Sequence, residues 1–488
     1  MCCWFSIIKR KMKRTKIVVT LGPASSSAEV IEEMIKAGAD VCRINFSHGT
    51  YEDVLQQIKN IRDSNKKLGT HTAILADLQG PKLRIGSVEN NGVELTAGSE
   101  ILITTTECIG TAERVYITYP QFPKDVKAGE IILIDDGKIL LTVIETNGKD
   151  EVKATVSHGG ILSSKKGVNL PNTKISLPCL TEKDLKDLDF ALTQKVDWIG
   201  LSFVRSASDI IELKHIIQKF DHDVRTKVVA KIEKPEAVFD IDAIIKETDA
   251  LMVARGDLGV EVPMQEVPVI QKMLVRKCLE ASKPVIIATQ MMESMITNIS
   301  PSRAEVNDVA NSVMDGADAV MLSAETSVGK HPAKVVEAMT KIIERVEQES
   351  NIYNRDNAAP ELNLHNERFI SDSICYTAAK MAQRTKAAAI ITMTHSGYTA
   401  FKLSSHRPKA AIYVFTDNYS ILTTLSLVWG VQGFYYDKNI STDHTIADIK
   451  FILKKTGFIK SNDLIINIAS VPLSEKGKSN MVKLSAVE

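Results

Sequence analysis

Eight short apolar runs, most of them followed by a segment with helical spacing, constrain this 488-residue chain more than any other feature. Segments such as 28–37, 183–192 and 304–313 repeat apolar residues at helical intervals, whereas the runs themselves have the length of strands. Alternation of buried strands and helices predicts parallel strands joined by crossover helices. Eight units predict an α/β fold built on a (β/α)8 TIM barrel. The runs are residues 17–21, 41–46, 73–77, 198–203, 228–233, 251–257, 285–289 and 319–325.

The segment between the third run and the fourth has a different sequence pattern. Short alternating stretches are broken there by the turn dipeptides Asn91-Gly92, Asp136-Gly137 and Asn147-Gly148, which indicates hairpins. A small all-β domain inserted into a barrel loop is placed where it can act as a lid. A polar linker after residue 350 then leads into a second α/β pattern, with strands expected at 389–392, 411–415 and 464–469 and helices near 372–383 and 421–427. We therefore expect a basic tail without fixed structure at 1–12, the barrel at 13–81 and 174–350, the lid at 82–173 and a C-terminal α/β domain at 351–488.

The polar residues that end the buried runs carry the first functional signal. In a barrel of this kind the loops after the strand ends form the active face. Lys231 and Glu233 share one face of their strand, because side chains repeat every two residues, and Asp257 ends the next run. One ammonium and two carboxylates suit an anionic substrate and Mg²⁺, which takes one or two carboxylates and substrate oxygens. The other polar strand-end residues are Arg43, Asn45, Ser47, Asp77, Ser202, Thr289 and Glu325.

Composition excludes several classes of function. Lysine plus arginine equals aspartate plus glutamate at 60 each, so no net field draws the chain to nucleic acid or to an anionic membrane. No apolar stretch approaches the roughly 20 residues that span a bilayer. The seven cysteines form no Cys-x-x-Cys pair, which favours reduced thiols in the cytoplasm. Neither glycine-rich nucleotide loop is present, and the ten histidines do not cluster at zinc spacing.

Taken together, several motifs of this chain resemble those of pyruvate kinase. They are Arg-Ile-Asn-Phe-Ser-His-Gly at 43–49, Lys-Lys-Gly-Val-Asn-Leu-Pro at 165–171, Val-Ala-Lys-Ile-Glu at 229–233, Ala-Arg-Gly-Asp-Leu-Gly at 254–259, Ala-Thr-Gln-Met-Met-Glu-Ser-Met at 288–295 and Ser-Arg-Ala-Glu-Val at 302–306. The resemblance runs from about residue 13 to the C-terminus in the family's order and spacing. It implies a barrel, an inserted β lid and a C-terminal α/β effector domain, the same layout that the pattern predicts.

The resemblance also implies a reaction and its residues. Phosphoenolpyruvate would give its phosphoryl group to ADP, yielding pyruvate and ATP, with Mg²⁺ or Mn²⁺ as cofactor in a cytoplasmic homotetramer. Lys231, Thr289 and Arg43 match the catalytic residues, with Lys231 on the migrating phosphoryl group, Thr289 beside the reacting carbon and Arg43 on the phosphates. Glu233 and Asp257 match the metal carboxylates. The backbone N–H groups around Gly256 and Asp257 would hold the substrate carboxylate.

Nucleotide and monovalent-cation positions follow from the same resemblance. The residues that match the nucleotide side are Asn45, Phe46, Ser47, His48, Arg84 and Lys166. Many family members hold K⁺ with residues matching Asn45, Ser47, Asp77 and the backbone of Leu78, and have a glutamate at the position of Lys82. An ammonium at that position can supply the charge of K⁺ and repels a second cation at short range. We therefore expect a vestigial K⁺ position and no K⁺ requirement.

The turn at 394–399 matches the family's effector loop. Its residues Thr394, Ser396, Gly397 and Thr399 offer hydroxyl and backbone N–H groups to an anion, although a routine helix cap has the same composition. Tyr398 stands where an arginine is frequent in the family. The sequence therefore favours a sugar monophosphate or a nucleoside monophosphate over a bisphosphate as an allosteric activator.

Two other functions use part of the same signal. A Mg²⁺-dependent barrel lyase or aldolase acting on a keto acid also uses strand-end carboxylates and a lysine, but it needs neither a nucleotide nor a lid. A family member that has lost activity and senses metabolites through its C-terminal domain would not need intact Lys231, Glu233, Asp257 and Thr289. An assay of pyruvate formation from phosphoenolpyruvate and ADP separates the three hypotheses.

Overall fold

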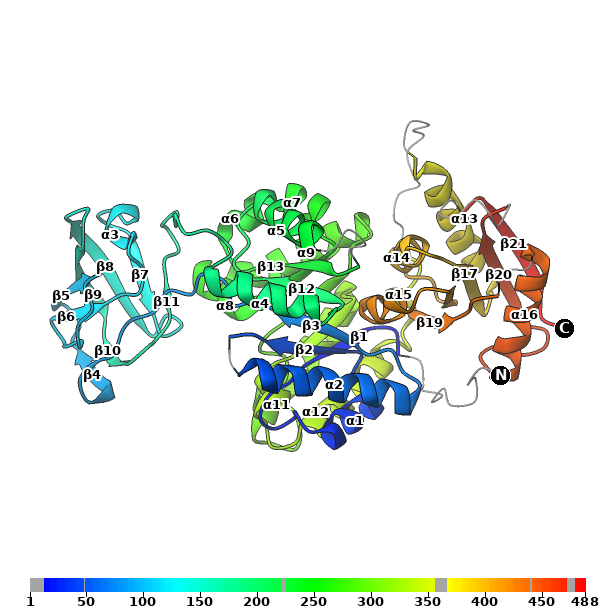
Figure 1. Ribbon diagram of the computed structural model, residues 1–488, viewed down its shortest axis with the longest axis horizontal. Helices are drawn as coiled ribbons and strands as arrows, with labels where there is room; N and C mark the ends of the chain where they lie inside the picture. Colours follow the sequence, from blue (N-terminus) through cyan, green and yellow to red (C-terminus); the bar gives the residue numbers. More distant parts are fainter. Residues whose placement is uncertain (1–12, 48, 221–224, 356–366, 439–440, 472–478) are drawn as a thin grey trace.

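Eight parallel strands close into a barrel at the centre of the molecule (Figure 1). The computed structural model describes residues 13–47, 49–220, 225–355, 367–438, 441–471 and 479–488. Around the barrel the strands follow the order β1-β16-β15-β14-β13-β12-β3-β2, which confirms the predicted fold class. The strands are β1 (Lys16–Thr20), β2 (Val41–Asn45), β3 (Ala73–Asp77), β12 (Trp198–Leu201), β13 (Lys227–Ile232), β14 (Ala250–Ala254), β15 (Val285–Ala288) and β16 (Ala319–Leu322).

Helices follow the barrel strands, and local signals set many of their ends. Thr50, Thr181 and Ser302 each form a capping box with the acidic residue three positions later, which satisfies two N–H groups at the helix start. Gly69 and Gly316 end two helices in the left-handed region, where a side chain would be strained. The helices are α1 (Ala28–Ala37), α2 (Tyr51–Leu68), α4 (Glu182–Thr193), α5 (Ala207–Phe220), α6 (Pro235–Phe239), α7 (Ile241–Glu247), α8 (Arg255–Glu261), α9 (Val267–Glu280), α10 (Arg303–Asp315), α11 (Ala324–Ser327) and α12 (Pro332–Val346).

The barrel interior is filled by side chains from alternate strand positions. Val41, Leu75, Trp198 and Met252 belong to this cluster, and none of them is more than 1% exposed. Leu427 of the C-terminal domain belongs to the same cluster, with Phe401 packed against it. The end of the barrel at the amino ends of its strands is therefore covered by apolar side chains of the C-terminal domain.

The lid projects away from the barrel at the opposite end of the molecule from the C-terminal domain (Figure 1). Its own buried cluster includes Ile103, Phe122 and Leu141, so it has a separate core. Strands β7 and β8 form a hairpin through Asp136 and Gly137, and β8 and β9 form another through Asn147 and Gly148, as predicted. The lid elements are β4 (Gly92–Leu95), β5 (Glu100–Thr104), β6 (Arg114–Tyr116), α3 (Phe122–Asp125), β7 (Ile131–Ile134), β8 (Ile139–Thr146), β9 (Glu151–His158), β10 (Gly160–Ser163) and β11 (Val168–Asn169).

Asn91-Gly92 does not join a hairpin, so that part of the prediction is wrong. Asn91 ends a 3-10 turn, and the strand that begins at Gly92 pairs with the distant β10. The dipeptide does adopt a turn, since Asn91 has a φ of 57°, but its two flanking segments do not pair with each other. A turn signal reports local backbone geometry, whereas the partner of a strand depends on the whole sheet.

The C-terminal domain contains a five-stranded sheet in the order β19-β18-β17-β20-β21, parallel except for β21. The sequence predicted β17, β18, β20 and the helices near α13 and α15, but it missed β19, α16 and β21. The last strand has mostly exposed or half-buried side chains, so it lacks the apolar run that identified the others. The elements are α13 (Phe369–Thr385), β17 (Ala389–Met393), α14 (Tyr398–Ser405), β18 (Ala411–Thr416), α15 (Tyr419–Thr424), β19 (Val431–Tyr435), α16 (Thr442–Lys455), β20 (Leu464–Ala469) and β21 (Met481–Ala486).

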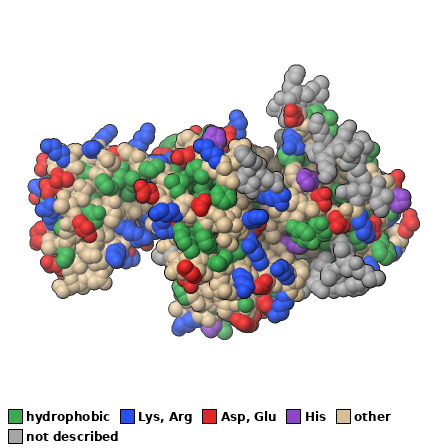
Figure 2. Space-filling model, viewed as in Figure 1, with side chains coloured by type: hydrophobic (Ala, Val, Ile, Leu, Met, Phe, Trp, Pro, Cys, Tyr) green, Lys and Arg blue, Asp and Glu red, His purple; other side chains and the backbone are tan. Residues whose placement is uncertain are grey.

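Charged side chains of both signs are interspersed over the face of the molecule shown in Figure 2, without a broad field of one sign. This distribution agrees with the balanced composition and offers no basic surface for nucleic acid on that face. None of the helices in the described part of the chain combines the length and the apolar character needed to cross a bilayer. The predicted tail at 1–12 lies outside the described residues.

Candidate functional site

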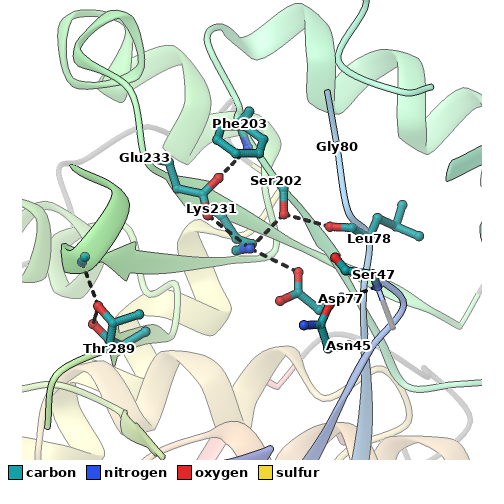
Figure 3. A network of polar contacts seen from close by, with 12 residues as sticks. Asn45, Ser47, Asp77, Leu78, Gly80, Ser202, Phe203, Lys231, Glu233 and Thr289 are labelled. Carbon is teal, nitrogen blue, oxygen red and sulfur yellow. Dashed lines mark hydrogen bonds and ion pairs between the residues drawn. The ribbon is translucent and has the colours of Figure 1, made fainter. Parts of the chain in front are cut away.

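Lys231 is the centre of a polar network at the C-terminal ends of the barrel strands (Figure 3). Its Nζ lies 3.0 Å from Glu233 Oε1 and 3.2 Å from Asp77 Oδ1, and it donates to Ser202 Oγ at 2.7 Å. The three partners come from or directly follow β13, β3 and β12, which are neighbours in the barrel. Burial disfavours the charged ammonium, but Asp77 and Glu233 outweigh that effect and raise the pKa of Lys231 to about 12. The site therefore holds a fixed positive charge at neutral pH.

Asp77 is held by two cations at once. Arg43 donates through Nε to Asp77 Oδ2 at 2.6 Å and also donates to Thr20 Oγ1 at 3.0 Å. Burial alone would raise the pKa of Asp77, but the charges of Lys231 and Arg43 together lower it below its usual value. The carboxylate stays ionised and ties the two cations to the same edge of the barrel. Arg43 and Lys231 can therefore face one anionic group from two directions.

Glu233 and Asp257 are the residues that could hold a divalent metal. Burial raises the pKa of Glu233 to about 7, because Lys231 offsets the loss of water only in part and the charge of Asp257 adds to the rise. A cation shared by two neighbouring carboxylates, one of them buried, would strongly stabilise their ionised forms. The described residues contain no cluster of three or more His, Cys, Asp or Glu side chains suited to a metal. Two carboxylates fit Mg²⁺, which usually takes its remaining ligands from water and substrate.

Thr289 follows β15 with strained backbone geometry. Its φ is 69° and that of Gln290 is 53°, a region that β-branched residues rarely adopt. The hydroxyl of Thr289 accepts a hydrogen bond from Gly256 N at 2.7 Å and donates one to Ala288 O at 2.6 Å. Strain of this kind persists only where the surrounding structure imposes it, and such residues cluster at functional sites. Thr289 and the start of α8 are thereby held together.

The predicted nucleotide residues fall into two groups. Asn45 and Ser47 lie at the end of β2, where Ser47 N donates to Asn45 Oδ1 at 3.1 Å, and Phe46 packs into the barrel core. Arg84 lies in the lid stalk, where its Nη1 donates to Lys165 O at 3.1 Å. Lys166 in the same stalk forms an ion pair of 2.8 Å with Asp135 of the lid. His48 lies outside the described residues.

A cleft open to solvent lies between the lid stalk and the barrel. Lys82, Phe203, Lys234 and Asp257 are among the residues that line it. Lys82 is exposed there, and Leu78, the backbone position predicted for K⁺, accepts through its carbonyl from Ser202 Oγ at 2.7 Å. The predicted metal residue Asp257 and the predicted substitute charge Lys82 thus face the same cleft.

Three residues of the site were not assigned a role from the sequence. Ser202 bridges Lys231 to the carbonyl of Leu78, and Phe203 N donates to Glu233 Oε2 at 2.6 Å. Arg255 donates to Thr289 O at 2.7 Å and forms an ion pair of 2.7 Å with Asp308. Ser202 was recognised only as a polar strand end. A signal for Phe203 was lacking, because its contribution comes from its backbone and not from its side chain.

The predicted effector turn joins β17 to α14. Thr394 Oγ1 accepts from Gly397 N at 3.0 Å, and Gly397 has a φ of 84°, which explains a glycine at this position. Ser396 is exposed, whereas Thr399 is buried with its hydroxyl 3.1 Å from that of Ser479. The hydroxyl of Tyr398 donates to Asp372 Oδ1 at 2.5 Å. Thr394 and Ser396 therefore form the solvent-facing part of the predicted set, whereas Gly397 and Thr399 are buried.

Comparison with known proteins gives one consistent result. Residues 12–336 match the family model described as pyruvate kinase, barrel domain, and residues 372–485 match the model described as pyruvate kinase, alpha/beta domain. A pyruvate kinase of Geobacillus stearothermophilus is 42% identical over 97% of this chain and 80% of its own length. That of Corynebacterium efficiens is 44% identical over 96% of this chain and 97% of its own. A solved pyruvate kinase from Cryptosporidium parvum has a TM-score of 0.90 at 33% identity, covering 98% of this chain and 96% of its own.

Proposed function

This chain belongs to the pyruvate kinase family, and from that premise we propose that it transfers the phosphoryl group of phosphoenolpyruvate to ADP, giving pyruvate and ATP. The observation that carries the proposal is Lys231, a buried ammonium between the carboxylates of Asp77 and Glu233 at the active face of the barrel. Phosphoryl transfer depends mainly on positioning and charge stabilisation, and a fixed cation supplies both.

Each part of the site has a place in this reaction. The bond from phosphorus to the enol oxygen breaks, a bond to a terminal oxygen of ADP forms, and the enolate takes up a proton at carbon to become pyruvate. Lys231 and Arg43 face the phosphoryl group, and Lys231 also stabilises the enolate. The N–H groups around Gly256 and Asp257 orient the substrate carboxylate, and Thr289 lies beside the reacting carbon. Asn45, Phe46, Ser47, His48, Arg84 and Lys166 border the nucleotide.

Mg²⁺, or Mn²⁺ in its place, would be held by Glu233 and Asp257. Support comes from the rise in the pKa of Glu233, which burial and the neighbouring charge of Asp257 cause. When bound, the metal supplies Lewis-acid stabilisation of the charge on the substrate oxygens. The protein residues exclude water from that charge and hold it in position.

A direct assay tests the function. The purified chain with phosphoenolpyruvate, ADP and Mg²⁺ should form pyruvate and ATP in equal amounts, and it should form neither without ADP. Chelation of the metal should stop turnover, and Mn²⁺ should restore it. Pyruvate formation that does not depend on ADP, or no turnover in the complete mixture, would contradict the proposal.

The chain is further expected to work without K⁺, because Lys82 opens into the same cleft as Asp257 and Asp77 is already paired with two cations. Activity in tetramethylammonium buffer should be close to that in K⁺ buffer. Lys82→Glu should create a K⁺ requirement, since it replaces a fixed cation by an anion. The matched control is Lys149→Glu on an exposed turn of the lid, which should leave the K⁺ response unchanged. A tenfold or larger activation of the wild type by K⁺ would overturn this expectation.

An allosteric activator with one phosphate group is proposed for the turn at 394–399. Two cations lie beside Tyr398 of this turn. The Arg368 guanidinium is 4.4 Å from its ring, and Lys402 Nζ is 3.5 Å from Asp372, the carboxylate to which Tyr398 donates. Sugar monophosphates and nucleoside monophosphates should raise activity at subsaturating phosphoenolpyruvate. Ser396→Asp should abolish that response without changing activity at saturation, because a carboxylate repels phosphate. If every such metabolite has no effect, the turn does not bind an effector.

Assembly and location complete the proposal. We place the enzyme in the cytoplasm as a homotetramer, as the family resemblance implies. The thiols support the location, because the five cysteines in the described part of the chain are all free. Exposed apolar side chains on the barrel helices, such as Phe239 and Val269, support contacts with further subunits.

A further inference from the structure

Glu261 connects the lid stalk, the segment after β13 and helix α8, and the proposed reaction gives it no role. It is the last residue of α8, and its side chain is 1% exposed. Lys234 Nζ lies 2.6 Å from Glu261 Oε1, and Asn169 Nδ2 donates to the same oxygen at 2.7 Å. The second oxygen, Oε2, is buried and has no hydrogen-bond partner among the described residues. Burying an ion pair costs desolvation energy, so this pair need not stabilise the folded protein. A role in fixing one conformation is the alternative that we consider.

The partners of Glu261 connect it to the metal carboxylates and to the lid. Lys234 directly follows Glu233, and Glu261 lies four residues after Asp257, which places both carboxylates on one face of α8. Asn169 is the last residue of β11, the strand by which the lid returns to the barrel. Asn169, Lys234 and Asp257 all line the cleft between the lid and the barrel. One carboxylate thus links the lid stalk to both residues that would hold the metal.

The segment that leaves the barrel for the lid is anchored to helix α4. Gly80 N donates to Asp184 Oδ1 at 3.0 Å, and Asp184 is the acidic residue of the capping box that Thr181 begins at α4. Among the described residues, the hydrogen bonds of Asp184 go to Gly80 and Thr181 and not to Glu233 or α8. Within the stalk, Val168 N donates to Leu83 O at 3.0 Å, and Arg84 pairs with Gly167 in an isolated antiparallel bridge, so the two stalk segments are joined to each other. The contact of Asn169 therefore determines how the stalk sits relative to Asp257.

We propose that Glu261 is a positioning residue that couples the orientation of the lid to Glu233 and Asp257, through Asn169 on the lid side and Lys234 on the barrel side. This inference rests on the proposed function, because it assigns the lid to the nucleotide and the barrel to phosphoenolpyruvate. Charge-assisted hydrogen bonds at the pivot of the lid hold the stalk in register with α8. When the lid closes over a nucleotide, the carboxylates of Glu233 and Asp257 are then already in position.

Asn169→Asp tests the coupling, since it sets a carboxylate against Glu261 and removes the hydrogen bond. Hydrogen exchange measured by mass spectrometry should show at least about tenfold faster exchange in the stalk at 164–169, because a hydrogen bond to a charged group is lost. Exchange in β8, inside the lid core, should not change. The Michaelis constant for ADP should rise by a similar factor, while that for phosphoenolpyruvate should stay within twofold.

The double substitution Asn169→Asp with Glu261→Gln exchanges the donor and the acceptor and leaves Lys234 with a carboxylate partner. It should restore both the exchange rates and the Michaelis constant for ADP to within threefold of the wild type. Glu261→Gln alone, in which Lys234 loses its carboxylate partner, should not show wild-type values. Asn91→Asp, which adds the same charge at an exposed position of the lid, is the matched control and should have no effect. Asn169→Ala, which adds no charge, replaces Asn169→Asp if that variant does not fold.

Unchanged exchange in the stalk of Asn169→Asp or Asn169→Ala, or failure of the double variant to recover, would overturn the coupling. Equal rises in both Michaelis constants would also overturn it, because a general loss of structure affects both substrates. The exchange measurement needs no substrate. A wild type that forms no pyruvate would therefore refute the proposed function while the exchange data still decide on the contact of Glu261.

Discussion

Lys231→Met should lower kcat by at least about 10²- to 10³-fold, since one preorganised electrostatic group contributes roughly that much to the stabilisation of a transition state. Methionine keeps much of the volume of lysine but cannot carry the charge that the proposed reaction needs at the migrating phosphoryl group. The substitution leaves Asp77 paired with Arg43 at 2.6 Å, so one of the two buried carboxylates keeps a partner. The fold should therefore survive, and steady-state kinetics with a thermal melt would measure both effects.

Lys283→Met is the matched control for that variant. Lys283 lies just before β15, at the opposite end of the barrel, and donates to Thr248 O at 2.6 Å. The same chemical change far from the active face should leave kcat within threefold of the wild type. Turnover of Lys231→Met within threefold of the wild type would refute the role of Lys231. Loss of activity in both variants would point to a general effect of removing a buried lysine.

Arg407→Leu should produce the largest loss of stability among single substitutions considered for this chain. Arg407 is 1% exposed, and its Nη2 donates to Asp318 Oδ2 at 2.9 Å and to Gly316 O at 2.8 Å. It belongs to the C-terminal domain, whereas Asp318 directly precedes β16 of the barrel. Removal of Arg407 leaves the carboxylate of Asp318 buried without its cation. Breaking such a pair from one side costs about 3–5 kcal/mol in free energy of unfolding.

Calorimetry and urea unfolding would measure this loss, with the unfolding of the two domains resolved where they separate. The matched control is Arg345→Leu, because Arg345, in the last turn of α12, forms an exposed pair with Glu349 just beyond the helix. Exposed pairs contribute at most about 1 kcal/mol, so the control should change stability little. Arg407→Lys should recover only part of the loss, because lysine cannot make several planar contacts at once. A loss for Arg407→Leu no larger than that of the control would contradict the assignment.

Much of the fold could be predicted from the sequence because its signals are local. Each barrel strand is buried on both faces, which produces a short continuous apolar run, and each capping box occupies four consecutive residues. The elements that were missed have weak local signals, as in β21 with its exposed side chains. The turn at Asn91 was recognised correctly as a turn and wrongly as part of a hairpin, because the pairing of β4 with β10 spans most of the lid.

The candidate site divides in the same way. The positions of Lys231, Glu233 and Asp257 at strand ends follow from two neighbouring runs, so their proximity was predictable. The ion pair between Asp77 and Lys231 depends on β3 lying beside β12, although the whole lid separates these strands in the sequence. The hydrogen bond from Phe203 N to Glu233 comes from the backbone, which no residue type reveals. The location of the strand ends was therefore predictable, but most of the contacts among them were not.

The sequence by itself determined the fold class, the order of the barrel, lid and C-terminal regions, and the residue types at the active face. Burial pattern and turn chemistry are properties of short segments, and they need no knowledge of distant residues. Only the tertiary structure decided which charges meet. Asn169 contacts Glu261 across 92 positions of the chain, and Arg407 contacts Asp318 across 89. Contacts of that range are determined by the closure of the barrel and the docking of the other domains, because pairing energy depends on distance in space and not along the chain.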